Sequence, residues 1–224
     1  MSIKKLGETP VTTILLIANV IVFVLMTFSG GSENTANLIR FGAMAKPLVY
    51  EGGWWRVITA SFIHIGFLHI LFNMYFLYSI GPVFERLYGP YKFLVIYILA
   101  GAMGNLFTYA FGRVNAVSAG ASTSLYGIFG LAIGLMINYK DDAILSSFGA
   151  SFMSIIVINV IYSLISPNVG IMGHLGGFLG GVLLAGVFPV TNRSLPTMTI
   201  AISAFAFILL SFLFVRIGNN SLMV

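Results

Sequence analysis

The chain has 224 residues, of which 58% are hydrophobic and only 8% are charged, and its mean hydropathy is +1.01. Soluble domains carry roughly 25% charged residues, so this composition excludes a soluble globular protein and indicates an integral membrane protein. The net charge of +5 comes from basic residues scattered through loops, which gives no support to nucleic-acid binding, and the absence of cysteine excludes disulfides and thiolate chemistry.

Apolar runs of membrane length follow one another along the chain. A bilayer has a hydrocarbon core of ~30 Å, which a helix crosses in about 20 residues. Because backbone polar groups in lipid must be satisfied within the segment, every run is expected to be an α-helix. The seven runs lie near residues 11–28, 62–80, 91–111, 121–138, 144–165, 174–190 and 197–215. We therefore expect an all-α membrane protein, a polytopic bundle of about seven transmembrane helices.

The first run determines the expected orientation. Lys4 and Lys5 precede it, and no convincing cleavage site follows it, so we expect a retained helix rather than a signal peptide. Lys and Arg are divided six to five between the two sides of the bundle, and the lysine pair favours a cytoplasmic N-terminus. An odd number of crossings then places the C-terminus outside.

Only the connection at 29–61 is long, and it carries Trp54-Trp55-Arg56. Tryptophan favours the headgroup layer, so we expect this loop at the membrane surface. No internal repeat or low-complexity tract is evident. The chain, 1–224, is expected to form one domain with a core over about 11–190 and an additional C-terminal helix over about 197–215.

Two polar residues, each at the start of an apolar run, carry the most information about function. Ser122 follows Gly120 and Ala121 at the head of the fourth run, and His174 heads the sixth. Polar side chains are costly in lipid, so a nucleophile and a base at such positions suggest chemistry within the bilayer. A lone serine more often bonds back to a carbonyl, and a histidine among glycines is sometimes incidental to helix packing, so the two must be considered together.

The even-numbered runs all start from the same side of the membrane, which is the outside in this topology. If each ends at the inner edge of the hydrocarbon core, Ser122 lies ~6 Å, His174 ~8 Å and His69 ~12 Å below the outer edge, at ~1.5 Å per residue. Similar depths on three helices favour a single site that opens outward.

Further residues would complete such a site. His69 and Asn73 are four apart on one helix face, and both can donate hydrogen bonds, either between helices or to a developing oxyanion. Gly177 and Gly181 form a face of small residues that would let the sixth run approach the glycines of the fourth. Gly120 permits an unusual backbone angle at the helix entry.

Three histidines raise the alternative of a metal site. The zincin motif is absent, and the six acidic residues are all expected in tails or loops, so none is expected to complete a metal shell or to orient His174. We therefore expect a Ser–His dyad rather than a triad, with no metal and no cofactor. Tyr126, one turn after Ser122, is expected to stack on the imidazole.

Together these motifs resemble the rhomboid family of intramembrane serine proteases, over roughly residues 54–181. The resemblance rests on Trp55-Arg56, on His64, His69 and Asn73, on Gly120-Ala121-Ser122 with Tyr126, and on Gly170, His174, Gly177 and Gly181. The resemblance also fits Glu85-Arg86 with Gly89 to the family's loop between the second and third helices. It implies that Ser122 is the nucleophile and His174 the general base. It also implies that His69, Asn73 and the Ser122 amide form the oxyanion hole and that Arg56 structures the first loop.

The resemblance further implies an enzyme that cleaves transmembrane segments of other membrane proteins. Its partners would be those protein substrates and the lipid bilayer, with no nucleic acid and no metal. It would lie in a bacterial plasma membrane with the active site open to the outside. The alternatives are a catalytically inactive relative that binds and escorts membrane proteins, and a transporter. One residue departs from the family pattern, because Thr123 stands where a glycine usually follows the serine.

Overall fold

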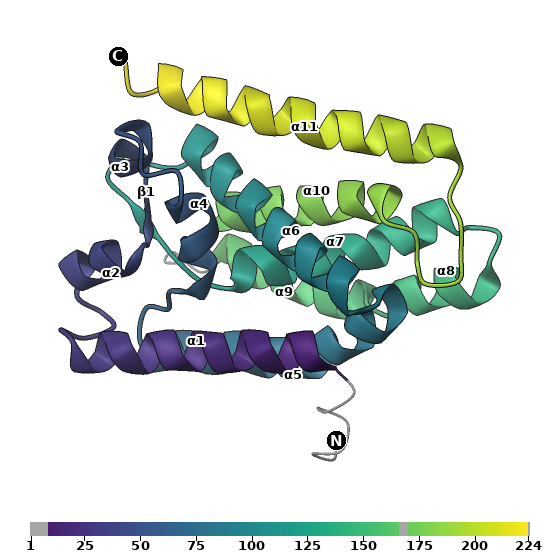
Figure 1. The fold of residues 1–224 in the computed structure, drawn as a ribbon, viewed down its shortest axis with the longest axis horizontal. Coiled ribbons are helices and arrows are strands. Elements are labelled where there is room, and N and C mark those ends of the chain that lie inside the picture. Colours follow the sequence, from purple (N-terminus) through teal and green to yellow (C-terminus); the bar gives the residue numbers. More distant parts are fainter. Residues whose placement is uncertain (1–8, 166–169, 224) are drawn as a thin grey trace.

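The computed structural model describes residues 9–165 and 170–223, and helices dominate it (Figure 1). The long helices are α1 (Pro10–Phe28), α5 (Phe67–Tyr88), α6 (Pro90–Phe111), α7 (Ser122–Asn138), α8 (Ala143–Ala150), α9 (Met153–Ile165), α10 (Ile171–Val187) and α11 (Thr197–Asn220). Among these described residues, five helical segments are long and apolar enough to span a membrane, counting α8 and α9 as one, and α7 and α10 are shorter apolar helices. The predicted all-α polytopic bundle is confirmed.

The second helix differs most from its predicted bounds of 62–80. It begins after Gly66, whose φ is +76°, and continues through Pro82 to Tyr88. The charged pair that follows Pro82 was expected to form a loop, but Glu85 is buried inside the helix. Since α5 ends later than expected, the assumption behind the ~12 Å depth of His69 was wrong: 19 residues to Tyr88 span about 28 Å, nearly the whole hydrocarbon core.

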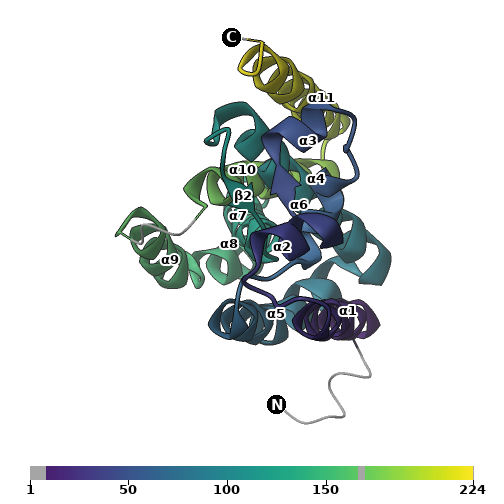
Figure 2. The same cartoon turned by 90° about the vertical axis from the view of Figure 1, so that its left-hand side faces the viewer.

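Helices α6, α7 and α10 form the centre of the bundle. Figures 1 and 2 show α1 and α5 side by side along one flank and α11 along the opposite flank, while α9 stands at the periphery. Glycines allow the central helices to approach closely. A Cβ on Gly181 would overlap the carbonyl oxygen of Gly127, and a Cβ on Gly134 would overlap the side chain of Ala185. Small residues at such contacts are a general means of packing helices in membranes.

Glu85 joins the start of α1 to the end of α5. Its carboxylate accepts hydrogen bonds from the backbone N–H groups of Val11 (2.9 Å) and Thr12 (2.7 Å) and from the Thr12 hydroxyl (2.7 Å). Pro10 opens α1 and has no N–H to satisfy. A side chain from another helix therefore caps α1, and its negative charge lies where the helix dipole favours it.

The first loop is structured rather than extended. It contains α2 (Thr35–Phe41), β1 (Met44–Ala45), α3 (Lys46–Tyr50), α4 (Arg56–Thr59) and the 3₁₀ turn η2 (Ala60–Phe62). Strand β1 pairs antiparallel with β2 (Val117–Ser118), which lies just before α7. Arg56 Nη1 donates to the carbonyl oxygens of Ile39 (2.7 Å) and Ala43 (3.0 Å), and its guanidinium lies 4.4 Å from the ring centre of Trp55. The loop covers the end of the bundle where α7 and α10 begin (Figure 1).

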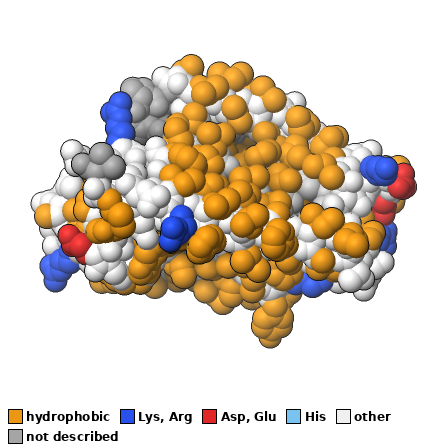
Figure 3. All heavy atoms as spheres, turned by 90° about the horizontal axis from the view of Figure 1, so that it is seen from above, with side chains coloured by type: hydrophobic (Ala, Val, Ile, Leu, Met, Phe, Trp, Pro, Cys, Tyr) orange, Lys and Arg blue, Asp and Glu red, His pale blue; other side chains and the backbone are white. Residues whose placement is uncertain are grey.

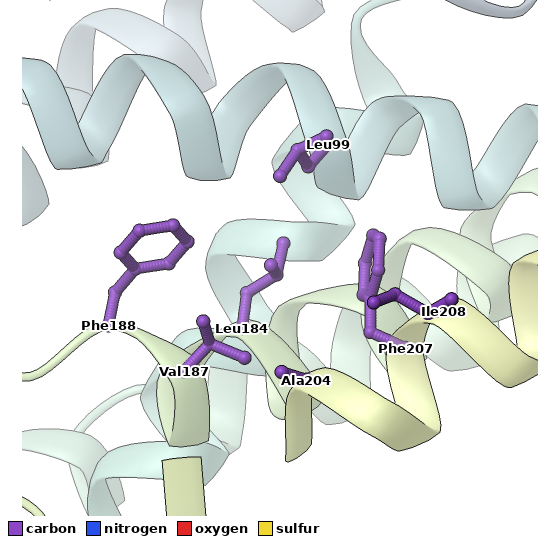
Figure 4. A pocket seen from close by; sticks show the side chains of 7 residues that line it. All are labelled: Leu99, Leu184, Val187, Phe188, Ala204, Phe207 and Ile208. Atoms are coloured by element: carbon purple, nitrogen blue, oxygen red, sulfur yellow. The ribbon is translucent and has the colours of Figure 1, made fainter. Parts of the chain in front are cut away.

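The outside of the bundle has the surface expected of a protein in lipid. Hydrophobic side chains occupy the middle of the face in Figure 3, and most charged side chains lie toward its two ends. An apolar groove of about 170 Å³ separates α11 from α6 and α10 (Figure 4). The groove is lined by Leu99, Leu184, Val187, Phe188, Ala204, Phe207 and Ile208. Lys4 and Lys5, on which the predicted orientation depends, lie outside the described residues.

Candidate active site

Ser122 and His174 meet at the first turns of two adjacent helices. Ser122 is the first residue of α7, and His174 lies in the first turn of α10. His174 Nε2 lies 2.9 Å from Ser122 Oγ, which is hydrogen-bonding distance for a base and its nucleophile. His174 is buried, with 9% of its surface exposed.

Glycines on α10 bring the two side chains together. A Cβ on Gly177 would overlap the carbonyl oxygen of Thr123, in the first turn of α7, and a Cβ on Gly181 would overlap that of Gly127, one turn later. Glycine at these two positions therefore lets the backbone of α10 contact the backbone of α7 directly. His174 lies three residues before Gly177 and seven before Gly181, so it shares their face of α10 and lies beside the start of α7.

Tyr126 holds the plane of the imidazole. Its ring is stacked on His174 with the centroids 4.0 Å apart and the planes inclined by 10°. Tyr126 lies one helical turn after Ser122, so the same face of α7 presents both the serine and the stacking surface. Phe129 packs edge-on against the Tyr126 ring, with the centroids 5.6 Å apart.

The backbone before Ser122 is fixed by hydrogen bonds to the first loop. Gly120 has a φ of +134°, which favours glycine, and its N–H donates to the Ala60 carbonyl (2.9 Å). The N–H of Ala121 donates to His64 Nε2 (3.3 Å). Burial lowers the pKa of His64 to about 3, with a smaller contribution from the His69 ring, so His64 stays neutral and can accept this bond.

His69 borders an open space beside Ser122. A Cβ on Gly120 would lie 2.8 Å from His69 Nε2 and 3.4 Å from Ser122 Oγ, so glycine leaves open a space bordered by both side chains. The N–H of Ile65 donates to His69 Nδ1 (3.3 Å), so the neutral ring carries its proton on Nε2. That N–H points to the serine side of the ring.

Asn73 lies one turn further along α5 and is buried. Its amide nitrogen donates to the His69 carbonyl (2.8 Å), which uses one of its two N–H bonds. The Ser122 N–H is a third donor, since the first N–H groups of a helix have no acceptor within it. The donors available to an oxyanion thus come from α5 and from the N-terminus of α7.

Thr123 is accommodated by glycines on the neighbouring helices. A Cβ on Gly104 or on Gly173 would lie 2.9 Å from the Thr123 side chain, so glycine at both positions makes room for it. Its hydroxyl lies 3.3 Å from Ser61 Oγ, which also accepts a bond from the Asn105 amide (3.3 Å). Thr123, the residue that departs from the family pattern, therefore fits the space between its neighbours, and its hydroxyl has a hydrogen-bond partner.

The sequence analysis missed Ser163, which lies on α9. Its Oγ is 2.9 Å from His174 Nδ1 and 2.6 Å from the Tyr126 hydroxyl, and it donates to the Asn159 carbonyl (2.9 Å). Asn159 and Ser163 are two polar residues spaced by four in a very apolar run. That spacing was the available signal, because it places both on one helix face.

Glu85, the one acidic residue inside a transmembrane helix of the described chain, is remote from the dyad. It lies 16 residues after His69 on α5, about 24 Å along the helix axis, and binds the start of α1. Within residues 9–165 and 170–223, no three His, Asp or Glu side chains are grouped in a way that could hold a metal ion.

Comparisons with known proteins match the same part of the chain. The rhomboid domain model matches residues 51–191 of the chain, which include every residue of the site described above. The chain belongs to the rhomboid family. It is 34% identical over 179 residues to Rhomboid protease GluP of Bacillus subtilis (strain 168), and the match covers 80% of this chain and 35% of that protein.

Other relatives are similar in the same region. Putative rhomboid protease YdcA of Bacillus subtilis (strain 168) is 34% identical over 137 residues, covering 61% of this chain and 68% of the relative. Rhomboid-like protease 1 of Toxoplasma gondii is 33% identical over 150 residues, covering 64% of this chain and 50% of the relative. The match thus spans about a third of GluP and half of the Toxoplasma protein, and rhomboid membership concerns the helical bundle.

Proposed function

We propose that this rhomboid-family protein is an intramembrane serine endopeptidase in which Ser122 is the nucleophile and His174 the general base. The observation that carries the proposal is the 2.9 Å contact between Ser122 Oγ and His174 Nε2 at the start of two closely packed helices. Its relatives are named rhomboid proteases, which supports the same assignment. The stacked Tyr126 ring and the donors beside Ser122 supply what acyl transfer requires besides the dyad.

Peptide hydrolysis by this dyad proceeds in two halves. In the first, Ser122 Oγ attacks the peptide carbonyl carbon while its proton passes to His174 Nε2, and the proton then goes to the leaving nitrogen as the C–N bond breaks. In the second, Nε2 takes a proton from water, the resulting hydroxide attacks the ester carbon, and the proton returns to Ser122 Oγ. The Ser122 N–H and the His69 Nε2–H donate to the oxyanion in both halves, and Asn73 has a second amide N–H to contribute.

The substrate proposed is a transmembrane segment of another protein. The helices that carry the dyad have 17 residues each, about 26 Å, whereas α5 and α6 have 22 each, about 33 Å. Helices this short start below the membrane surface when their other ends are level, which favours a site sunk into the bilayer. A substrate helix must unwind locally there to present a carbonyl to Ser122.

Activity-based labelling tests the function directly. A fluorophosphonate or isocoumarin probe should label the purified protein at Ser122, and both Ser122→Ala and His174→Ala should lose the label. Cleavage of a model transmembrane substrate should fall by up to ~10⁶-fold in Ser122→Ala. Ser154→Ala, which changes an exposed serine on α9, should label and cleave like the unmodified protein.

The main rival is an inactive relative that binds and escorts membrane proteins. It predicts no labelling and no cleavage by the unmodified protein, together with retained binding of a transmembrane partner. Binding alone does not require a serine and a histidine within hydrogen-bonding distance of each other, so the rival gives no reason for the contact between Ser122 and His174.

A further inference from the structure

Ser163 is unusual among the residues of α9. Most of that helix is exposed, and its two buried residues within the described chain are Ile156 and Ser163, seven apart on one face. Ser163 is 5% exposed. A polar side chain buried against the bundle from a peripheral helix needs partners, and the partner at 2.9 Å is the Nδ1 atom of His174.

The contacts around this serine leave one of its lone pairs for His174. To act as a base at Nε2, a neutral His174 must carry its proton on Nδ1. The Tyr126 hydroxyl donates its proton to the Asn159 carbonyl (2.7 Å), so it can accept one from Ser163, whose Oγ is 2.6 Å away. The Asn159 carbonyl, 2.9 Å from Ser163 Oγ, is a second acceptor for the Ser163 proton. With that proton on either acceptor, Ser163 Oγ can accept from His174 Nδ1–H at 2.9 Å.

The opposite arrangement would disable the dyad. If Ser163 donated its proton to Nδ1, then the imidazole proton would lie on Nε2 and point at Ser122 Oγ, which could not transfer its own proton there. The acceptor at Nδ1 therefore decides whether the dyad can act. In serine proteases with a triad, a carboxylate occupies this position and fixes the same tautomer.

Stacking on Tyr126 does not replace this contact. A stacked ring restrains the tilt of the imidazole but leaves it free to rotate within its own plane. Two hydrogen bonds in that plane, one at each ring nitrogen, stop the rotation and aim Nε2 at Ser122. Ser163 and Tyr126 thus restrain different motions of the same ring.

We propose that Ser163 is a positioning residue that holds His174 in the Nδ1–H tautomer and orients Nε2 toward Ser122. The proposal rests on the proposed protease function. Because the acceptor is a neutral hydroxyl rather than a carboxylate, its removal should cost less than the loss of a triad aspartate, which is ~10⁴-fold. We expect Ser163→Ala to lower kcat by about 10- to 100-fold, with KM changed less than about twofold, because the lost hydrogen bond acts on the chemical step.

The kinetic test compares Ser163→Ala, Ser163→Thr and Ser154→Ala in purified protein with a model transmembrane substrate. Threonine keeps the hydroxyl, so Ser163→Thr should recover most of the lost kcat, whereas Ser154→Ala should match the unmodified protein. A kcat for Ser163→Ala within twofold of the unmodified value would overturn the positioning role. Loss confined to KM would also overturn it. If the unmodified protein neither labels nor cleaves, the protease function itself fails, which is a separate outcome.

A second measurement determines the tautomer in the unmodified protein, so it tests the proposal even if Ser163→Ala folds poorly. The chain has three histidines, so ¹⁵N-histidine NMR of the full protein can resolve them, with His64→Gln and His69→Gln to assign the signals. His174 should carry its proton on Nδ1 in the unmodified protein, and Ser163→Ala should shift the signal toward a mixture of tautomers. A proton on Nε2 in the unmodified protein would overturn the proposal.

Discussion

At the scale of single residues, the site depends on the partner of each polar atom. Gly120 and Ala121 direct their N–H groups to Ala60 and His64, which leaves the next N–H, that of Ser122, to an oxyanion. His69 accepts on Nδ1 and so presents a donor on Nε2. The His69 donor is therefore set by the bond that Ile65 makes to the other ring nitrogen, and a residue that makes such a bond need not touch a substrate.

Thr123 offers the sharpest prediction at this scale. Thr123→Val keeps the shape that fits between Gly104 and Gly173 but removes the hydroxyl beside Ser61, so unfolding free energy should fall by about 1 kcal/mol. The cleavage rate should stay within about threefold, because the hydroxyl is not aimed at the nucleophile. Thr123→Gly should be less stable than Thr123→Val, since it also empties the space and loosens the helix start.

Denaturation in detergent and cleavage assays measure both effects. A more than tenfold loss of activity in Thr123→Val at unchanged stability would contradict this account and give the hydroxyl a role in the reaction.

Ser163 shows why the sequence alone does not predict every residue of the site. Ser163 lies in the run 144–165, which was predicted only as a transmembrane helix, and the spacing of its polar residues does not indicate which helix packs beside His174. The tyrosine partner was foreseeable because it lies on the same helix as Ser122, whereas the serine partner depends on tertiary packing.

At the scale of helices, the sequence patterns predicted which segments are helical better than they predicted where each helix ends. The glycines of the fourth and sixth runs indicated a close contact, and α7 and α10 do pack through them. The end of α5 was misplaced because Pro82 and the charged pair Glu85-Arg86 resemble a loop. A buried carboxylate inside a helix becomes understandable only with its partner, the start of α1, which is more than 70 residues away in the chain.

Glu85 should consequently contribute to stability rather than to catalysis. Glu85→Gln replaces one acceptor oxygen with a donor that faces the N–H groups of α1, so the free energy of unfolding should fall by about 1.5–3 kcal/mol, the usual value of a hydrogen bond to a charged group. Glu51→Gln, at an exposed position of the first loop, is the matched control and should change stability by less than about 0.5 kcal/mol. Equal stability of the two variants would show that α1 does not need this cap.

At the scale of the whole molecule, the first loop and the C-terminus lie at the same end of the bundle (Figure 1). Tyr109, near the end of α6, donates from its hydroxyl to Asn219 Oδ1 near the end of α11 (2.6 Å). Lys46 in the first loop donates to the Gly112 carbonyl, just after α6 (3.0 Å). The dyad begins α7 and α10 beneath the same loop, so the side of the membrane that holds the loop is also the side on which we propose the site opens.

Labelling of single cysteines tests this orientation, and because the chain has no native cysteine, any label on the purified variant reports the introduced position. Glu51, Asp141 and Ser221 are exposed positions in three separate connections or ends of the chain. A membrane-impermeant maleimide applied to intact spheroplasts should label Glu51→Cys and Ser221→Cys, and should label Asp141→Cys only after permeabilisation. The reverse pattern would invert the predicted topology while keeping the fold. Labelling of Glu51→Cys and Ser221→Cys from opposite sides would contradict the fold itself, because the contacts of Tyr109 and Lys46 require both ends to share one side.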